Sequence, residues 1–241
     1  MLINYIVEDK SNKKKKKYYK SPDKADLNLL QKIERIHIPY WYPISPLPKG
    51  INTEQPKKSH NFYYVHQFFT KRNLLLIAKL FNESRNSAYM RQFLFVLTSF
   101  LVKTGSLFHN IGFKKVSYIP AGAVPNVLYI PSTLAERNIF ILMLRKLDSI
   151  LKAYSSMINK NNFIISTQSN TNLLNVPSNS VDYIFTDPPF GGNIMYSELN
   201  YIWESWLKVH TNNNKEAIIN KIQNKGLLEY QYLMEQCFKE N

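Results

Sequence analysis

The chain has 241 residues, 44% of them apolar, which is enough to bury a core and argues against disorder along its whole length. Its 31 lysines and arginines outnumber 17 acidic residues, for a net charge of +14, so a polyanion is the first partner to consider. The single cysteine, Cys237, excludes an internal disulfide, and the longest apolar stretch, residues 93–102, is too short to cross a bilayer as a helix.

Residues 1–26 form a basic N-terminal segment that contains five consecutive lysines, Lys13 to Lys17. Like charges repel and the segment has no apolar period, so we predict that it is disordered. Two interpretations stay open. The segment is either a solvated charge run, in a chain with 25 lysines and 26 asparagines, or an arm that contacts nucleic-acid phosphates.

We expect residues 27–132 to form a region of helices and loops, and to be an insertion that contacts DNA. Apolar spacing predicts helices over residues 27–36, 71–81 and 87–102. Thr70 is the expected N-cap of the second helix. Loops are predicted over residues 103–116 and 120–125, and a short strand over 127–130.

A proline-rich stretch, residues 38–50, interrupts this region and carries three adjacent aromatic residues, Tyr40, Trp41 and Tyr42. Its prolines oppose regular structure and favour an extended path. The aromatic side chains either stack on nucleic-acid bases or pin the loop to the surface of the domain.

Residues 133–241 alternate predicted helices with short apolar strands. Thr133 and Glu136 form a capping box that opens a helix over 134–157. The apolar side of that helix is expected to comprise Phe140, Met143, Leu147, Ile150, Leu151 and Tyr154. Strands are predicted over 163–167 and 181–186, a helix over 194–209, and a final pair of short helices over 216–239. This alternation favours an α/β domain with a parallel sheet.

The sequence Asp187-Pro188-Pro189-Phe190 follows directly on the apolar run 181–186. Open α/β sheets bind their ligands in loops at the carboxyl ends of the strands. The two prolines lack backbone donors and have fixed φ angles, so their carbonyls are rigid acceptors. Asp187 adds a carboxylate acceptor and Phe190 a flat apolar face.

These groups together suit an exocyclic amine on a flat heteroaromatic ring. The two N–H bonds of the amine would point at the Asp187 carboxylate and the Pro188 carbonyl, and the ring would stack on Phe190. Such an arrangement draws the nitrogen lone pair out of conjugation and aims it at an electrophile. A base in duplex DNA reaches such a site only when it is flipped out of the stack.

This motif resembles the catalytic motif of the S-adenosylmethionine-dependent DNA amino-methyltransferases, Asp/Asn/Ser-Pro-Pro-Phe/Tyr/Trp, which act on adenine N6 or cytosine N4. The surrounding phrases NLLNVPSNSVDYIFTDPPF and YSELNYIWESWL are similar to this family. The phrases HQFFTKRNLLLIAKL and PNVLYIPST are similar to its large adenine-specific members, so the resemblance extends from Ile33 to the C-terminus. It implies a partial Rossmann-like methyltransferase α/β fold with additional helices.

The resemblance also implies roles for individual residues. Asp187, Pro188, Pro189 and Phe190 would be catalytic, and Phe69 and Thr70 would lie near the methionine end of the cofactor, S-adenosyl-L-methionine. The implied partner is DNA. We expect no membrane partner and, because the N-terminus lacks a signal-peptide pattern, a soluble cytoplasmic protein.

One part of the family pattern is missing. The chain has 7 glycines and no Phe-x-Gly-x-Gly turn to hold the cofactor. We therefore expect a truncated methylase, with two alternatives open: one subunit of a split methylase that works with a complementary fragment, or a catalytically silent DNA-binding remnant. A third interpretation is an RNA or protein N-methyltransferase. The five histidines lack metal-ligand spacing, so no metal is expected.

Overall fold

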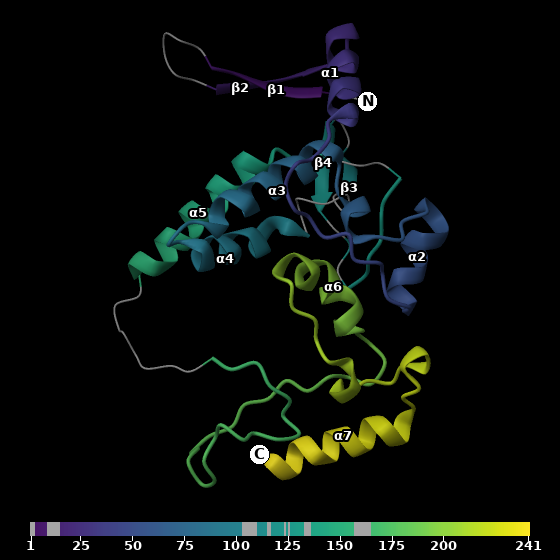
Figure 1. The fold of residues 1–241 in the computed structure, drawn as a ribbon, viewed down its shortest axis with the longest axis vertical. Helices are drawn as coiled ribbons and strands as arrows, with labels where there is room; N and C mark the ends of the chain where they lie inside the picture. Colours follow the sequence, from purple (N-terminus) through teal and green to yellow (C-terminus); the bar gives the residue numbers. More distant parts are fainter. Residues whose placement is uncertain are drawn as a thin grey trace. The chain divides into compact units, whose positions relative to one another are not determined.

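The computed structural model describes residues 3–8, 15–102, 110–114, 117–122, 124, 126–132, 136–156 and 165–241. The chain divides into two compact units, residues 1–40 and residues 41–241 (Figure 1). This boundary differs from the domain limits expected from composition, 26/27 and 132/133. It falls inside the proline-rich stretch instead.

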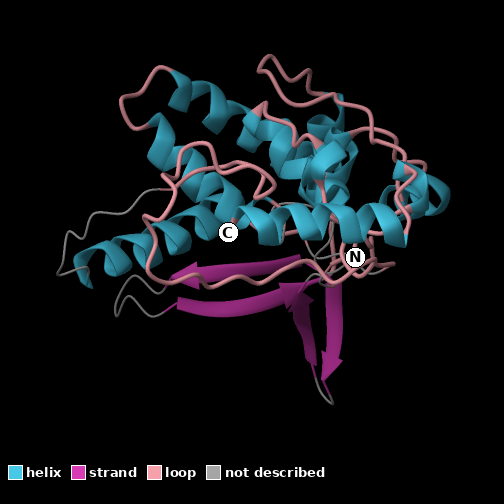
Figure 2. Cartoon of the chain, turned by 90° about the horizontal axis from the view of Figure 1, so that it is seen from below, coloured by secondary structure: helices cyan, strands magenta, loops and turns pink. Residues whose placement is uncertain are grey.

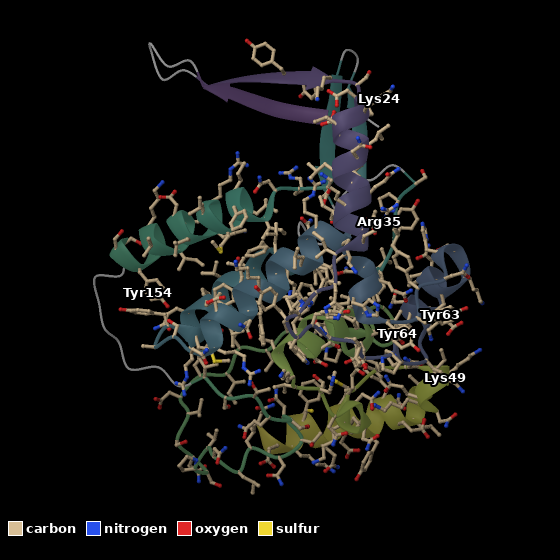
Figure 3. The ribbon with its side chains drawn as sticks, turned by 45° about the horizontal axis from the view of Figure 1, so that its top comes forward. Lys24, Arg35, Lys49, Tyr63, Tyr64 and Tyr154 are labelled. Carbon is tan, nitrogen blue, oxygen red and sulfur yellow. The ribbon has the colours of Figure 1, made fainter. Side chains whose placement is uncertain are left out.

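The N-terminal unit contains an antiparallel hairpin and one helix. Strand β1 (Ile3–Glu8) pairs with β2 (Lys15–Lys20), and α1 (Lys24–Arg35) follows. Figure 3 labels the two ends of α1. The Asp23 carboxylate accepts the Asp26 backbone N–H at 3.0 Å, and the Asp26 carboxylate accepts the Asp23 N–H at 2.9 Å, a reciprocal cap. Part of the segment expected to be disordered therefore forms regular structure.

The second unit is mainly helical (Figure 2). Its helices are α2 (Ile51–His60), α3 (Lys71–Arg85), α4 (Met90–Leu101), α5 (Ile139–Ser156), α6 (Tyr196–Leu207) and α7 (Leu227–Glu240), with short 3-10 turns at Val65–Phe68, Asn213–Lys215 and Lys221–Gln223. Strands β3 (Asn110–Lys114) and β4 (Ser117–Gly122) form a second antiparallel hairpin. Helices α3, α4 and α5 contact one another.

The predicted Rossmann-like α/β fold is wrong for this structure. The described strands form only two separate two-stranded antiparallel hairpins, and such a fold requires a central parallel sheet (Figure 2). Residues 127–130 and 181–186, both predicted as strands, are not in strands, and neither are residues 165–167, whereas 163–164 lie outside the described residues. An apolar run becomes a parallel strand only where neighbouring strands satisfy its backbone groups. No described strand lies beside these segments.

The core of the second unit centres on Trp206 of α6, which is fully buried. Its ring lies 6.0 Å from that of Trp41, 5.9 Å from Phe69 and 6.0 Å from Phe81, each distance joining ring centroids. The other fully buried apolar side chains include Val65, Phe68, Ile77, Leu97, Phe100 and Ile202. The proline-rich stretch thus packs one ring, Trp41, which is itself 36% exposed, against the core, in line with the interpretation that the aromatic side chains pin this loop to the domain.

The start of α3 agrees with the sequence-based prediction, whereas the start of α5 does not. The Thr70 hydroxyl accepts the Asn73 N–H at 3.2 Å and caps α3, as predicted. Helix α5 begins at Ile139 rather than at residue 134, and Asn138 accepts the Ile141 N–H at 3.2 Å. Residues 136–138 are not helical, so the helix starts later than predicted, and Thr133 of the predicted capping box lies outside the described residues.

Helix α5 also exposes much of the side that we expected to be buried. Only Ile139 and Leu142 are buried on this helix. Phe140, Leu147, Leu151 and Tyr154 are exposed, and Tyr154 lies in the last turn (Figure 3). The apolar period identifies the helix, but the neighbours α3 and α4 determine which of its sides is covered.

Candidate functional site

The motif lies in a loop that presents its key side chains outward. Asp187 is exposed, Pro188 and Pro189 are half-buried, and Phe190 is 70% exposed. No described group donates a hydrogen bond to the Asp187 carboxylate or to the Pro188 carbonyl. These two acceptors therefore remain available to a ligand.

The second half of the loop is held firmly. The Tyr230 hydroxyl donates to the Pro189 carbonyl at 2.7 Å, and the Ile219 N–H donates to the Gly191 carbonyl at 3.2 Å. Gly191 has a φ of +53°, which favours glycine, and a Cβ on Gly192 would lie 3.2 Å from the Ile219 carbonyl oxygen. The two glycines thus let the loop turn sharply against the segment that contains Ile219.

That supporting segment, residues 213–226, is itself fixed by buried polar groups. The Asn220 side chain accepts the Ile222 N–H at 2.9 Å, and Asn220 and Lys225 exchange backbone hydrogen bonds at 2.8 and 3.0 Å. The Lys225 ammonium donates to the Asn213 and Glu216 carbonyls. Burial lowers the pKa of Lys225, and the Glu216 carboxylate opposes that shift. The motif loop therefore contacts a segment that is itself fixed by hydrogen bonds.

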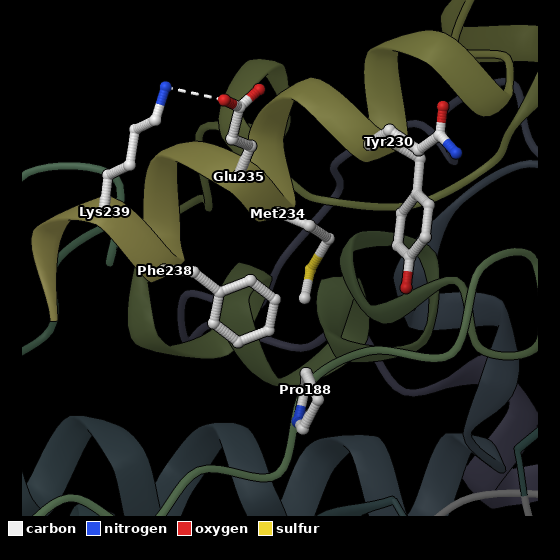
Figure 4. A pocket seen from close by; sticks show the side chains of 7 residues that line it. Pro188, Tyr230, Met234, Glu235, Phe238 and Lys239 are labelled. Carbon is white, nitrogen blue, oxygen red and sulfur yellow. Dashed lines mark ion pairs between the residues drawn. The ribbon is translucent and has the colours of Figure 1, made fainter.

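Helix α7 forms one wall beside the motif. It begins after Gly226, whose N–H donates to the Glu229 carboxylate at 2.8 Å. Tyr230, Met234 and Phe238 recur every four residues on one side of α7 and point toward the loop at Pro188 (Figure 4). Together with Pro188 they line an open groove of about 640 Å³.

The apolar run that leads into the motif is unusually exposed. Tyr183 is 78% exposed, Phe185 84% and Ile184 46%. No described backbone group hydrogen bonds to residues 181–186. A buried parallel strand would show the opposite on both counts.

The two residues expected near the cofactor have other partners. Phe69 is 5% exposed and packs on Trp206. The Thr70 hydroxyl donates to Glu136 Oε1 at 2.6 Å, in addition to capping α3. Both side chains are therefore engaged in the fold, and their assignment to S-adenosylmethionine stays a prediction.

The other candidate groups have structural roles. Arg72, near the start of α3, pairs with Glu136 at 2.6 Å. Trp41 lies 5.0 Å from Phe81 between ring centroids, and the Lys208 ammonium lies 4.0 Å above the Trp41 ring. Within the described ranges, no cluster of three His, Cys, Asp or Glu side chains could hold a metal, and no helix is long and apolar enough to span a membrane.

Sequence reasoning missed two residues that organise the site region. The only sequence signal for Tyr230 is its four-residue spacing with Met234 and Phe238. The same spacing is equally typical of the buried side of a helix. The second residue is Glu198, an acid in the first turn of α6. It is 3% exposed and accepts the Asn52 backbone N–H at 2.7 Å, which caps α2 from a position 146 residues away. No local pattern could reveal that contact.

Comparison with known proteins adds no relative to this picture. No protein-family model, curated protein or solved structure matches the chain.

Proposed function

We propose that the chain is the part of a DNA amino-methyltransferase that receives the target amine, adenine N6 or cytosine N4, and that a complementary chain holds S-adenosylmethionine. The observation that supports this is the loop of residues 187–192, whose second half is held by hydrogen bonds and which leaves the Asp187 carboxylate and the Phe190 ring exposed and the Pro188 carbonyl without a described partner. A loop kept only as a turn has no need to leave all three available.

Each free group of the loop has a separate role in this proposal. Asp187 accepts one N–H of the amine and the Pro188 carbonyl accepts the other, while Phe190 stacks on the ring. The Pro189 carbonyl is engaged by Tyr230, so it shapes the loop and does not contact the amine. Orientation of the nitrogen lone pair, more than a strong base, is what this loop contributes to transfer.

The charge distribution supports DNA as the substrate and separates binding from chemistry. Residues 1–160 carry 26 lysines and arginines against 9 acidic residues, whereas residues 161–207 carry 4 acidic residues and no lysine or arginine. Phosphate contacts dominate non-specific DNA affinity. The N-terminal two thirds of the chain would therefore position the duplex, and the motif segment would receive the base.

A complementary chain is invoked because the residues present do not fit the cofactor. The sequence has no glycine-rich turn, and Phe69 and Thr70 are engaged elsewhere. The alternative function is a catalytically silent DNA-binding remnant. The exposed run 181–186 supports it, because a remnant would keep this apolar run after losing the segment that covered it.

Methyl transfer by the complemented chain distinguishes these two functions. The full chain is co-expressed with a neighbouring reading frame that encodes Phe-x-Gly-x-Gly, and transfer of labelled methyl from S-adenosylmethionine to duplex DNA is measured. Asp187→Ala should lower the rate about 30- to 1,000-fold, because a charge-assisted hydrogen bond to the reacting amine contributes about 2–4 kcal/mol.

Asp182→Ala is the matched control, because Asp182 is also an exposed acid of the same segment and lies outside the motif. It should transfer methyl groups at the parent rate. No methylation by the complemented parent chain would favour the silent remnant. Equal rates for Asp187→Ala and the parent would mean that the motif is only a turn.

A further inference from the structure

The surface between Pro188 and α7 forms a shallow groove of about 640 Å³ that is open to solvent and can cover one face of a ligand. Its walls are mostly apolar or aromatic: Pro188 on one side, and Tyr230, Met234 and Phe238 on the other (Figure 4). Phe238 is 62% exposed, so one face of its ring is open to a ligand.

The charges at the rim of the groove favour a neutral ligand. Lys239 and Glu235 are the two charged residues that line it, and they pair with each other at 2.6 Å (Figure 4). The two opposite charges offset each other, so the rim of the groove carries no net charge. A flat, uncharged ring matches these walls better than an anion does.

Tyr230 connects this groove to the motif. Its ring lines the groove, and its hydroxyl donates to the Pro189 carbonyl at 2.7 Å. A ligand that contacts α7 therefore lies against Pro188, the residue of the motif that lines the groove. The Pro188 carbonyl has no described partner, and Asp187 is its exposed neighbour in the sequence.

We propose that this groove binds the ring of the flipped base, with Phe238 as its stacking partner on α7 and Tyr230 as a positioning residue that holds the motif loop. This inference rests on the proposed function and adds a second wall to the site. The exocyclic amine reaches toward Asp187 and Pro188 while the ring lies against α7.

Binding measurements with an unpaired base test the proposal without a cofactor or methyl transfer. The full chain is titrated into a labelled duplex that carries one bulged adenine, and into the same duplex with an abasic site at that position. The parent chain should bind the adenine duplex about 5- to 150-fold more tightly, because stacking of one base on aromatic residues has this effect.

Phe238→Ala should remove most of that preference and leave affinity for the abasic duplex unchanged, because phosphate contacts lie elsewhere. Tyr232→Ala is the matched control, since Tyr232 is an aromatic residue of α7 that is 61% exposed and does not line the groove. It should keep the full preference. A Phe238→Ala variant that still prefers the adenine duplex as strongly as the parent overturns the proposal.

Tyr230→Phe tests the positioning role separately. It keeps the ring and removes the hydrogen bond to Pro189, so the preference for adenine should fall about 2- to 10-fold. The affinity for the abasic duplex should stay as in the parent, because the hydrogen bond acts on the motif loop and not on phosphate contacts. An unchanged adenine preference would overturn the positioning role.

Failure of this proposal and failure of the proposed function give different results. A parent chain that binds both duplexes equally has no base site in the groove, yet the methyl-transfer assay can still support the function. Competition by a glutamine-containing peptide, with no effect of the bulged adenine, would point to a protein substrate and would overturn the proposal as well.

Discussion

Two aromatic residues that lie close together in the sequence have opposite environments. Trp206 is fully buried among three other rings, whereas Phe185 is 84% exposed in a segment whose backbone has no described partner. Both belong to apolar stretches that we expected to be buried. The difference shows that hydrophobicity determines only a tendency to be buried, and that neighbouring elements decide whether it is satisfied.

Two carboxylates show the same contrast. Glu198 is 3% exposed and accepts hydrogen bonds from Asn52 at 2.7 Å and from Asn220 at 3.4 Å. Asp187 is exposed and has no described partner. A buried carboxylate needs hydrogen-bond partners, whereas an exposed one is solvated by water. The contrast shows that Glu198 stabilises the fold and that the fold does not depend on Asp187.

The largest expected effect tests the two aromatic environments directly. Trp206→Ala should lower the free energy of unfolding by about 3–5 kcal/mol, because it leaves a cavity in the core. Phe185→Ala should change it by no more than about 0.5 kcal/mol, as for most exposed positions. Urea unfolding followed by circular dichroism measures both variants. Similar losses for the two would mean that residues 181–186 are packed in solution and that the contrast is wrong.

A smaller effect is expected where Glu198 meets Gly50, the residue before α2. Glu198→Ala should cost about 1–3 kcal/mol, because it leaves buried donors unpaired. Gly50→Ala should lower the free energy of unfolding by a similar amount, about 1–3 kcal/mol. Its Cβ would lie 2.3 Å from Glu198 Cδ, so the site would be overpacked.

A double variant that combines Glu198→Ala with Gly50→Ala tests whether these two residues are in contact. Removing the Glu198 side chain makes room for the new Cβ, so the combined loss should be smaller than the sum of the two single losses. Thermal unfolding of the three variants measures this coupling. Strictly additive losses would show that the two residues do not meet, and that α2 is capped in another way.

The smallest effect concerns Asp23 at the exposed start of α1. The hydrogen bond from the Asp26 backbone lowers the pKa of Asp23 to about 2, with help from Lys20. Because the pKa is depressed on folding, the cap stabilises α1 above the ordinary value of 3.8 and is lost as the pH falls through about 2. Amide chemical shifts of residues 24–35 should show α1 fraying in this window.

Asp23→Asn provides the control for the pH experiment. Asparagine is also a good N-cap but does not titrate, so α1 in this variant should lack the pH step between 3.8 and about 2. A step that persists unchanged in Asp23→Asn would assign it to another carboxylate.

The sequence by itself was sufficient for features that depend on neighbours within one turn of a helix. Apolar spacing located α1, α3, α4 and α6 to within a few residues, and the Thr70 cap followed from the side chain at the start of α3. The turn at the motif was also predictable, because two prolines fix φ locally and two glycines permit the positive φ of a sharp turn.

Only the tertiary structure decided features that depend on contacts between distant segments. Residues 181–186 have the composition of a strand, but a strand also needs partners for its backbone, and composition cannot supply them. Likewise, the cap of α2 by Glu198 and the contact of Tyr230 with the motif loop each join residues far apart in the sequence, 146 and 41 positions respectively. Such contacts follow from how the whole chain packs, because no local preference encodes which distant side chain will reach a given backbone group.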